Sequence, residues 1–510
     1  MSTASKLLFA DYRLSILFGA LLMATAANRL WSSYANGFIQ ILGLTILYAV
    51  ITDNKVKNKF FLTWVFTTLW LVGSVWWLYI AMHQFGGLHP VLTVVALLLL
   101  CGGLASYYTA TVYVLISTYR YIPKIGRAWV FAACWTFAEL ARAQWWTGFP
   151  WAAIGYAQVD TSLSLAAPWL GVYGVGFLSA VISALLWEYQ GKIKIILIFS
   201  LAMALYPIIN STLTAEVKDT DISVTLLQGN IKQDEKFNIA RQDAVKWYLT
   251  ELKANESNLV VMPETAIPYI KEELPKEFWT VLRESTELEN KVAIIGIPTK
   301  DELKGYGNSA IGIGFNQELQ YDKYHLVPFG EFTPNILRWF TRLMNVDFGD
   351  FNKGDINQAL FHWNGQRMAM TICYEDLFGE DLAVRFKEEE NAPTLFVNIS
   401  NIGWFGDTSV VGQHVDIARM RSLEFKRPTL RATNSGGTAI IAANGEIVSQ
   451  LSPYVRGKLT GHIPATQKEI TFFARWAGKW GLMPLWILTS CVMLSALLIK
   501  RFNLFTESVK

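Results

Sequence analysis

The sequence is poor in charged residues and in cysteine. Only 17% of its 510 residues are charged and 52% are hydrophobic, whereas soluble domains carry roughly a quarter charged residues. Cysteine gives no disulfide framework, because Cys101, Cys134 and Cys491 lie in long apolar runs, where a thiol behaves as a small hydrophobic group. The net charge of +3 is too small to suggest a nucleic-acid partner. The composition therefore indicates a membrane protein, or a membrane anchor joined to a globular domain.

Motifs for metals and nucleotides are also missing. No CxxC or HExxH pattern and no histidine cluster suggests a metal site. No glycine-rich phosphate loop follows an expected strand, since Gly436 and Gly437 alone are too little. We therefore expect neither a metal nor a cofactor.

The apolar residues are concentrated in the first 214 residues and near the C-terminus. A membrane-spanning helix needs about 20 apolar residues. We predict a transmembrane domain of seven helices at 1–214, a globular domain at 215–470, and a last transmembrane helix with a cytoplasmic tail at 471–510. The eight expected spans are 13–28, 35–52, 60–80, 91–117, 128–145, 162–187, 193–211 and 480–499.

Lysine and arginine are concentrated in every second connection between the expected spans. Such loops face the cytoplasm, so we expect both termini in the cytoplasm and the globular domain outside it. The basic residues are Lys6 and Arg13, then Lys55, Lys57 and Lys59, then Arg120, Lys124 and Arg127, then Lys192 and Lys194, and finally Lys500, Arg501 and Lys510.

Two features of the fifth expected span could be structural or functional. Glu139 and Arg142 are three residues apart and share a helix face, so they can pair. Ionisable residues at membrane depth are often functional, but Arg142 is near enough to the helix end to reach the interface. The aromatic run from Trp145 to Trp151 fits an interfacial belt better than a re-entrant lip around a lipid entrance.

Residues 215–470 alternate between short apolar strands and amphipathic helices, which is typical of an α/β fold. Asn444 and Gly445 indicate a hairpin that closes the domain. The expected strands are 222–227, 259–262, 292–297, 308–315, 368–372 and 394–399, and the expected helices are 239–254, 275–287 and 411–426.

Polar residues follow the ends of these strands. Glu264 follows the second strand, and Cys373, the only cysteine of the globular domain, follows the strand Met368–Ile372. In open α/β sheets the site gathers at the strands' carboxyl ends, so these residues and Lys323 can meet. Individually, each has an ordinary alternative: a buried structural thiol, a carboxylate beside a helix cap, or a solvated lysine paired with Glu331.

Together, these residue types suit nucleophilic catalysis. A thiol with a pKa of about 8.5 needs a base or a nearby cation to react at neutral pH. Glu264 could accept the proton, and Lys323 could stabilise the thiolate and the oxyanion of a tetrahedral intermediate. His325 and His414 are weaker partners, because neither has an obvious orienting carboxylate in the sequence.

Several sequence blocks resemble those of a known family. The blocks Met262–Thr265, Lys323–Glu331 and Ile372–Glu375 are similar to the Glu–Lys–Cys blocks of the nitrilase (carbon–nitrogen hydrolase) superfamily and, more narrowly, of the apolipoprotein N-acyltransferases. Further similar segments are Gln228–Ile231, Asn398–Gly406, Gln413–Arg421, Arg427–Pro428 and Arg431–Gly436, and in the membrane half Trp135, Glu139, Arg142, Thr147–Trp151 and Gly155–Tyr156.

The resemblance implies an αββα-sandwich, nitrilase-like domain on a helical bundle in a bacterial inner membrane. It also implies transfer of a fatty acyl group from the sn-1 position of a phospholipid, phosphatidylethanolamine above all, to a protein. The acceptor is the N-terminal amine of the diacylglyceryl-cysteine of apolipoproteins, and the intermediate is a thioester on Cys373. Although nitrilase-like domains often assemble, we expect a monomer because of the membrane anchor.

The resemblance also implies roles for individual residues. Glu264 is the base, Lys323 stabilises the oxyanion, and Cys373 is the nucleophile. The expected supporting residues are Glu331, Tyr374, Glu375 and Asn401. The expected lipid contacts are Phe237, Trp339, Phe340, Trp404, Phe405, Trp151, Glu139 and Arg142.

The sequence departs from the family pattern in two places, and one segment allows two interpretations. Phe237 stands where many members have tryptophan, and Asn401-Ile402-Gly403 where many have Asn-Asp-Ala. Residues 335–344, with Trp339 and Phe340 on an apolar face, fit either a mobile lid at the membrane surface or an ordinary amphipathic helix of the core.

Two other functions are compatible with parts of the pattern. A membrane-tethered amidase would use the same three residues with water or a small amine as acceptor. A non-enzymatic polytopic protein with an external sensor domain would need no essential cysteine. The similarity in the membrane half makes the acyltransferase the favoured hypothesis.

Overall fold

The computed structural model describes residues 11–190, 220–287, 291–302, 305–314, 317–333, 351–466 and 469–509. The chain forms two compact units. One contains Met1–Tyr79, Leu88–Ala215 and Trp480–Lys510, and the other contains Ile80–Gly87 and Glu216–Lys479. We call them the helical unit and the α/β unit. The expected span 193–211 and the expected arm 335–344, with Trp339 and Phe340, lie outside the described residues.

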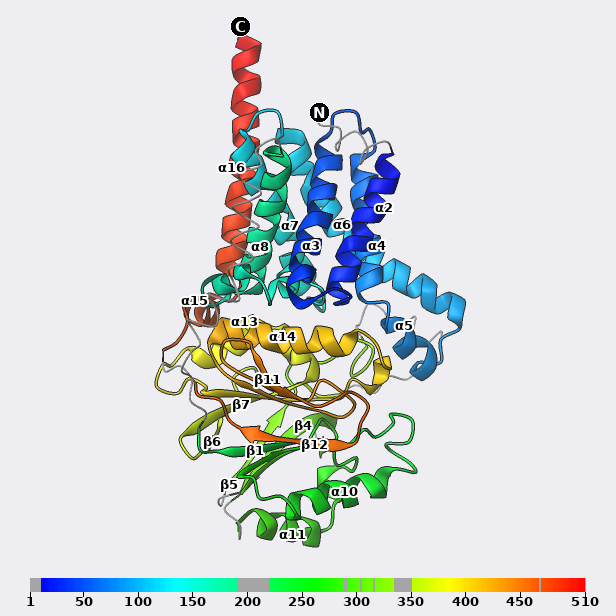
Figure 1. Ribbon diagram of the computed structural model, residues 1–510, viewed down its shortest axis with the longest axis vertical. Coiled ribbons are helices and arrows are strands. Elements are labelled where there is room, and N and C mark those ends of the chain that lie inside the picture. Colours follow the sequence, from blue (N-terminus) through cyan, green and yellow to red (C-terminus); the bar gives the residue numbers. More distant parts are fainter. Residues whose placement is uncertain are drawn as a thin grey trace. The chain divides into compact units, whose positions relative to one another are not determined.

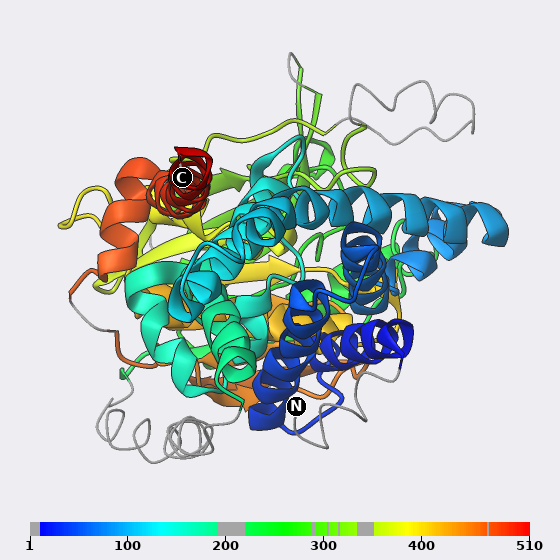
Figure 2. The same ribbon diagram turned by 90° about the horizontal axis from the view of Figure 1, so that it is seen from above.

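The described part of the helical unit is built from apolar helices (Figures 1 and 2). Each packs against the next in the order α2, α3, α8, α7, α6, α4 and back to α2, while α16 packs on α7 and α6. The helices are α2 (Tyr12–Ala27), α3 (Ser33–Thr52), α4 (Lys59–Ser74), α5 (Leu78–Ile80), α6 (Pro90–Thr118), α7 (Lys124–Gln144), α8 (Ala167–Glu188) and α16 (Met483–Val509).

Fewer than eight helices of the described residues can be counted as membrane spans. Four are long and apolar enough, or five if Lys59–Ser74 and Leu78–Phe85 form one broken span. The expected first span, α2, has only 16 residues. The expected fifth span, α7, contains four charged residues, namely Lys124, Arg127, Glu139 and Arg142. The structure therefore shows a bundle with several apolar helices, and not clearly eight spans.

The α/β unit contains two six-stranded sheets. The first has the order β12-β1-β2-β3-β4-β5, and the second has the order β11-β10-β9-β8-β7-β6. The strands of the first sheet are β1 (Ser223–Gln228), β2 (Leu259–Val261), β3 (Val292–Asp301), β4 (Gly305–Gly314), β5 (Gln317–Asp322) and β12 (Gly457–His462). Those of the second are β6 (Phe361–Trp363), β7 (Gln366–Ile372), β8 (Leu395–Ser400), β9 (Thr429–Thr433), β10 (Ala439–Ile441) and β11 (Ile447–Gln450).

Helices cover the outer face of each sheet, so the α/β unit has four layers (Figure 1). The main core lies between the sheets and joins apolar side chains such as Leu226 and Ile294 with Met370 and Val397. The helices are α10 (Arg241–Lys253) and α11 (Lys276–Glu287) on the first sheet, α13 (Gly379–Ala383) and α14 (Val410–Phe425) on the second, and α15 (Phe472–Trp480) near the end. The predicted α/β class of this domain is confirmed.

The six strands expected from the sequence correspond to β1, β2, β3, β4, β7 and β8, and β10 and β11 form the expected hairpin. Strands β5, β6, β9 and β12 were not expected, and all of them except β9 are edge strands. An edge strand needs no continuous apolar run, because one of its sides faces no neighbouring strand. Gln317–Asp322 is largely polar and exposed for this reason.

Candidate active site

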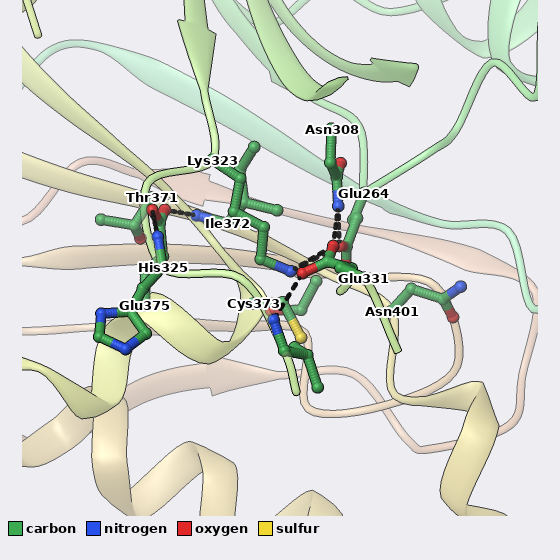
Figure 3. Close-up of polar contacts among 12 residues, drawn as sticks. Glu264, Asn308, Lys323, His325, Glu331, Thr371, Ile372, Cys373, Glu375 and Asn401 are labelled. Atoms are coloured by element: carbon green, nitrogen blue, oxygen red, sulfur yellow. Dashed lines mark hydrogen bonds and ion pairs between the residues drawn. The ribbon is translucent and has the colours of Figure 1, made fainter. Parts of the chain in front are cut away.

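Glu264, Lys323 and Glu331 meet in one buried cluster at the strand ends (Figure 3). Lys323 Nζ lies 3.3 Å from Oε1 of Glu264 and 2.9 Å from Oε1 of Glu331. Asn308, on β4, donates from Nδ2 to the same two oxygens at 2.6 and 2.7 Å. The two carboxylates therefore share one ammonium group and one amide group, which offset their mutual repulsion.

The backbone of Glu264 is held close to β3. It follows β2 and precedes Thr265, whose φ of 53° is left-handed. A Cβ at Gly296 would lie 2.3 Å from the carbonyl oxygen of Pro263 and 2.7 Å from Cα of Glu264. Only glycine allows this approach, so the end of β2 and the direction of Glu264 depend on position 296.

Cys373 lies directly after β7 at a sharp turn, with a φ of 53°. The side chain of Glu375 fixes this turn, because it accepts hydrogen bonds from two backbone N–H groups. One comes from Ile372, just before Cys373, at 2.6 Å, and another comes from Tyr324, just after Lys323, at 2.6 Å. Glu375 therefore ties the segment of Cys373 to the segment of Lys323. Figure 3 shows the Cys373 side chain next to the cluster of carboxylates.

A second set of polar side chains holds the carbonyl group of Cys373. His414 Nε2 lies 3.2 Å from that oxygen, and Nδ1 of the same ring lies 2.8 Å from a guanidinium nitrogen of Arg431. Arg431 is fully buried and also donates to Asp376 at 3.1 Å and to Asn398 at 2.9 Å. These groups fix the backbone on the C-terminal side of Cys373.

Burial and charge together determine the protonation states. Burial raises the pKa of the Cys373 thiol to about 12, with a further rise from Glu264, while Lys323 and Arg431 act in the opposite direction. Burial alone would lower the pKa of Lys323, but Glu264 and Glu331 outweigh it, so the net shift is upward. In the resting site Cys373 is thus a thiol and Lys323 an ammonium ion.

The expected supporting residues lie at or beside this cluster. The ring of Tyr374 is buried and packs edge-on against Phe378 at 5.3 Å. Asn401 donates to Gln233 at 2.7 Å and accepts from Asn434 at 3.2 Å. Both therefore bind other parts of the protein in this structure.

The expected lipid contacts of the α/β unit are more exposed. Phe237 and Trp404 are exposed, and Phe405 is partly buried. Trp404 packs edge-on against Phe85 at 5.3 Å. Exposed aromatic side chains of this kind are available to a lipid. The contact with a lipid itself stays a prediction.

In the helical unit Glu139, Arg142 and Trp151 are buried. Arg142 donates to the carbonyl oxygens of Phe149 (2.9 Å) and Trp151, and Glu139 accepts from the N–H of Ile154 at 2.8 Å. The pair thus fixes the loop that follows α7, which is the structural alternative considered above. A direct lipid contact by these three residues stays a prediction.

Three residues of the site were not predicted from the sequence, namely Asn308, Arg431 and Lys236. Arg431 lies inside the buried strand β9, and Asn308 lies in β4 just before the apolar run Ala310–Ile313. Polar residues in otherwise buried strands need a partner, and that signal could have identified both. Lys236 gave no such signal, because it lies in a polar turn. Among the described residues, no group of three or more His, Cys, Asp or Glu side chains could hold a metal ion.

Both halves of the chain match models of known protein families. Residues 18–185 match the model of the apolipoprotein N-acyltransferase N-terminal domain, and residues 223–470 match that of carbon–nitrogen hydrolases. Among solved structures, a cysteine-to-alanine mutant of a Nesterenkonia amidase from the nitrilase superfamily has 14% identity and a TM-score of 0.38, over 51% of this chain and 94% of its own. A carbon–nitrogen hydrolase from Helicobacter pylori has 16% identity and a TM-score of 0.36, over 47% and 88%.

Relatives with curated names are similar over most of their length. The apolipoprotein N-acyltransferase of Verminephrobacter eiseniae is 42% identical over 443 residues, which is 82% of each chain. That of Ralstonia nicotianae is 36% identical over 464 residues, or 89% of this chain and 87% of its own. With this identity over so much of both chains, the protein belongs to the apolipoprotein N-acyltransferase family.

Proposed function

We propose that this protein transfers a fatty acyl group from a phospholipid to the N-terminal amine of a diacylglyceryl-cysteine on an apolipoprotein. The reaction proceeds in two steps through a thioester on Cys373. The observation that carries the proposal is the cluster of Glu264 and Lys323 beside Cys373, in a chain that belongs to this family over both of its halves.

In the first step the sulfur of Cys373 attacks the carbonyl carbon of the sn-1 ester. Glu264 accepts the thiol proton as the carbon–sulfur bond forms. The carbonyl oxygen becomes an oxyanion beside Lys323, whose ammonium group has an N–H left after its bonds to Glu264 and Glu331. When the ester carbon–oxygen bond breaks, Glu264 returns the proton to the leaving oxygen, and a lysophospholipid departs.

In the second step the amine of the acceptor attacks the thioester carbon. Glu264 takes one proton from the attacking nitrogen, and Lys323 again stabilises the oxyanion. The carbon–sulfur bond breaks, the proton returns to the sulfur of Cys373, and the amide is released. Water must be excluded until the acceptor arrives, because a thioester exposed to water hydrolyses.

The proposal extends to the membrane arrangement and to the substrates. Eight spans would place both termini in the cytoplasm and the catalytic domain in the periplasm, with the protein in the bacterial inner membrane. Phosphatidylethanolamine would be the principal donor, and the protein would act as a monomer. The alternating basic loops support this topology.

An acceptor experiment tests the proposal. The purified full-length protein is mixed with phosphatidylethanolamine vesicles and a synthetic diacylglyceryl-cysteine peptide, and the products are separated by mass spectrometry. We expect acylated peptide, with a loss on the order of 10²–10⁴-fold in the Glu264→Gln variant. A membrane-tethered amidase would instead release free fatty acid at the same rate with or without the peptide, and this result would overturn the proposal.

A further inference from the structure

Lys236 is a buried lysine that has no role in the two steps above. Only 1% of its surface is exposed. Its Nζ donates a hydrogen bond to the backbone carbonyl oxygen of Glu264 at 3.0 Å. A buried ammonium group is costly unless it is paired, so the position of this lysine next to the expected base calls for a physical reason.

The bond from Lys236 completes the support of Glu264. On the β3 side, Gly296 packs directly against Pro263–Thr265, and its carbonyl oxygen accepts from the N–H of Ile267 at 3.2 Å. The carbonyl group of Glu264 itself is held by Lys236. Loss of the ammonium group would leave this buried carbonyl without that donor and would free the residue to turn.

The segment that carries Lys236 is itself fixed close to the site. The side chain of Asn434 donates to the carbonyl oxygen of Ile231 at 2.7 Å and accepts from its N–H at 3.1 Å. Gln233 accepts from Asn401 at 2.7 Å. Beyond Lys236 the segment turns outward, because Phe237 is 50% and Ile239 is 88% exposed. Lys236 is therefore the residue that this segment directs into the site.

The charge of Lys236 also acts on the carboxylate of Glu264. Burial lowers the pKa of Lys236 to about 8, and the Glu264 carboxylate opposes this fall. At neutral pH the ammonium ion is therefore still largely present. The other charged or titratable groups that act on Glu264 or share its cluster are Lys323, Glu331, Cys373 and Arg431.

We infer that Lys236 is a positioning residue for acyl transfer, which holds the backbone of Glu264 and places a second cation beside its carboxylate. The inference rests on the proposed function, because it assumes that Glu264 is the base. Glu264 then has two cations beside it. Lys323 faces the oxyanion, and Lys236 holds the backbone carbonyl oxygen of Glu264.

The test is the rate of acyl-Cys373 formation in the full-length protein as a function of pH. Purified wild-type protein is mixed with excess phosphatidylethanolamine in detergent, quenched with acid, and measured by intact mass from pH 5 to 9. The variants are Lys236→Met, which loses both charge and donor, Lys236→Gln, which keeps a donor without charge, and Lys236→Arg, which keeps both. The control is Lys291→Met, because Lys291 is equally buried and also donates to a backbone carbonyl, that of Asn255.

We expect Lys236→Met and Lys236→Gln to slow thioester formation at pH 7 by about 10-fold to 100-fold, which is less than removal of the base itself. Loss of the positive charge of Lys236 beside the carboxylate of Glu264 should also move the acid limb of the profile to higher pH. Lys236→Arg should restore the wild-type acid limb, and Lys291→Met should leave the rate and the profile unchanged.

Several results would overturn the inference. One is a Lys236→Met variant with the wild-type rate, and another is a slow variant whose acid limb has not moved, which would indicate a structural role alone. If neither uncharged variant folds, Lys236→Arg decides: a changed acid limb in a folded arginine variant contradicts the inference, and a wild-type limb supports it. A wild-type protein that forms no thioester would contradict the proposed function instead.

Discussion

The guanidinium group of Arg431 lies 2.8 Å from Nδ1 of His414. A guanidinium group can only donate, so Nδ1 must accept, and the ring proton is on Nε2, 3.2 Å from the carbonyl oxygen of Cys373. His414 is therefore neutral, and burial and Arg431 lower its pKa well below the ordinary value. In this arrangement the histidine is a donor to the nucleophile's backbone, and not a base for its thiol.

Replacement of His414 should therefore affect the position of Cys373. In His414→Ala the carbonyl group of Cys373 loses its histidine donor and Arg431 loses an acceptor, which should cost about 1–3 kcal/mol of stability. Thioester formation should slow, and His414→Gln, which keeps a donor near the position of Nε2, should recover part of the rate. Thermal unfolding and single-turnover acylation measure the two effects. An alanine variant with unchanged acylation would show that this bond does not position the nucleophile.

The neutral His414 also predicts how stability depends on pH. In the unfolded chain a histidine has a pKa of ~6.5, whereas the folded pKa of His414 is much lower. Between these two values only the unfolded state binds the proton, so this residue's contribution to stability is complete above pH ~6.5 and decreases at lower pH by up to about 1.4 kcal/mol per unit. The thermal midpoint of the wild type should therefore fall more steeply below pH 6.5 than that of His414→Gln. Parallel curves for the two proteins would contradict a neutral, buried His414.

Substitution of Asn308 by alanine and by aspartate should slow acyl transfer to different degrees. Its amide bonds to both Glu264 and Glu331, and hydrogen bonds to charged groups contribute about 1.5–3 kcal/mol each. We expect Asn308→Ala to slow acyl transfer at least tenfold at pH 7, and Asn308→Asp to slow it more, since a third carboxylate repels the other two. Asn391→Ala, at an exposed amide that pairs with Glu388, is the control. Equal activity of the alanine and aspartate variants would indicate that Asn308 contributes shape and not charge compensation.

The protonated state of Cys373 predicts its reactivity in the absence of substrate. Because burial and Glu264 raise its pKa to about 12, alkylation by iodoacetamide should accelerate by about tenfold per pH unit from pH 7 to 9 without a plateau. Lys323→Met should react still more slowly, because Lys323 favours the thiolate. The rate is measured by mass spectrometry of the peptide that contains Cys373. A plateau near neutral pH would reveal a thiolate formed before the reaction.

The sequence predicted the residues that follow strands better than the residues that support them. Glu264 and Cys373 follow apolar runs, which form β2 of the first sheet and β7 of the second, and the structure brings Lys323 and Glu331 beside Glu264. His414 and Arg431 are different, because they act on Cys373 only when α14 and β9 pack beside β7 and β8. That arrangement depends on sheet order, which local pattern does not determine.

The same reason explains the strands that were not expected. Strand β12 pairs with β1 across more than two hundred residues of sequence and completes the first sheet, yet its alternating pattern Gly-Lys-Leu-Thr-Gly-His has little apolar content. Lys236 is similar, since its turn is polar in sequence and its side chain is buried where it meets the backbone of Glu264. Partners distant in sequence determine both features.

The thioester on Cys373 is the central claim, and intact-mass analysis tests it most directly. The full-length protein is purified from membranes, supplied with phospholipid, and measured before and after hydroxylamine treatment. We predict a fatty-acyl mass increment that hydroxylamine removes, that is absent in Cys373→Ala, and that persists in Cys101→Ala. Absence of the increment from wild-type protein supplied with phospholipid, together with full activity of Cys373→Ala in cells, would contradict the account.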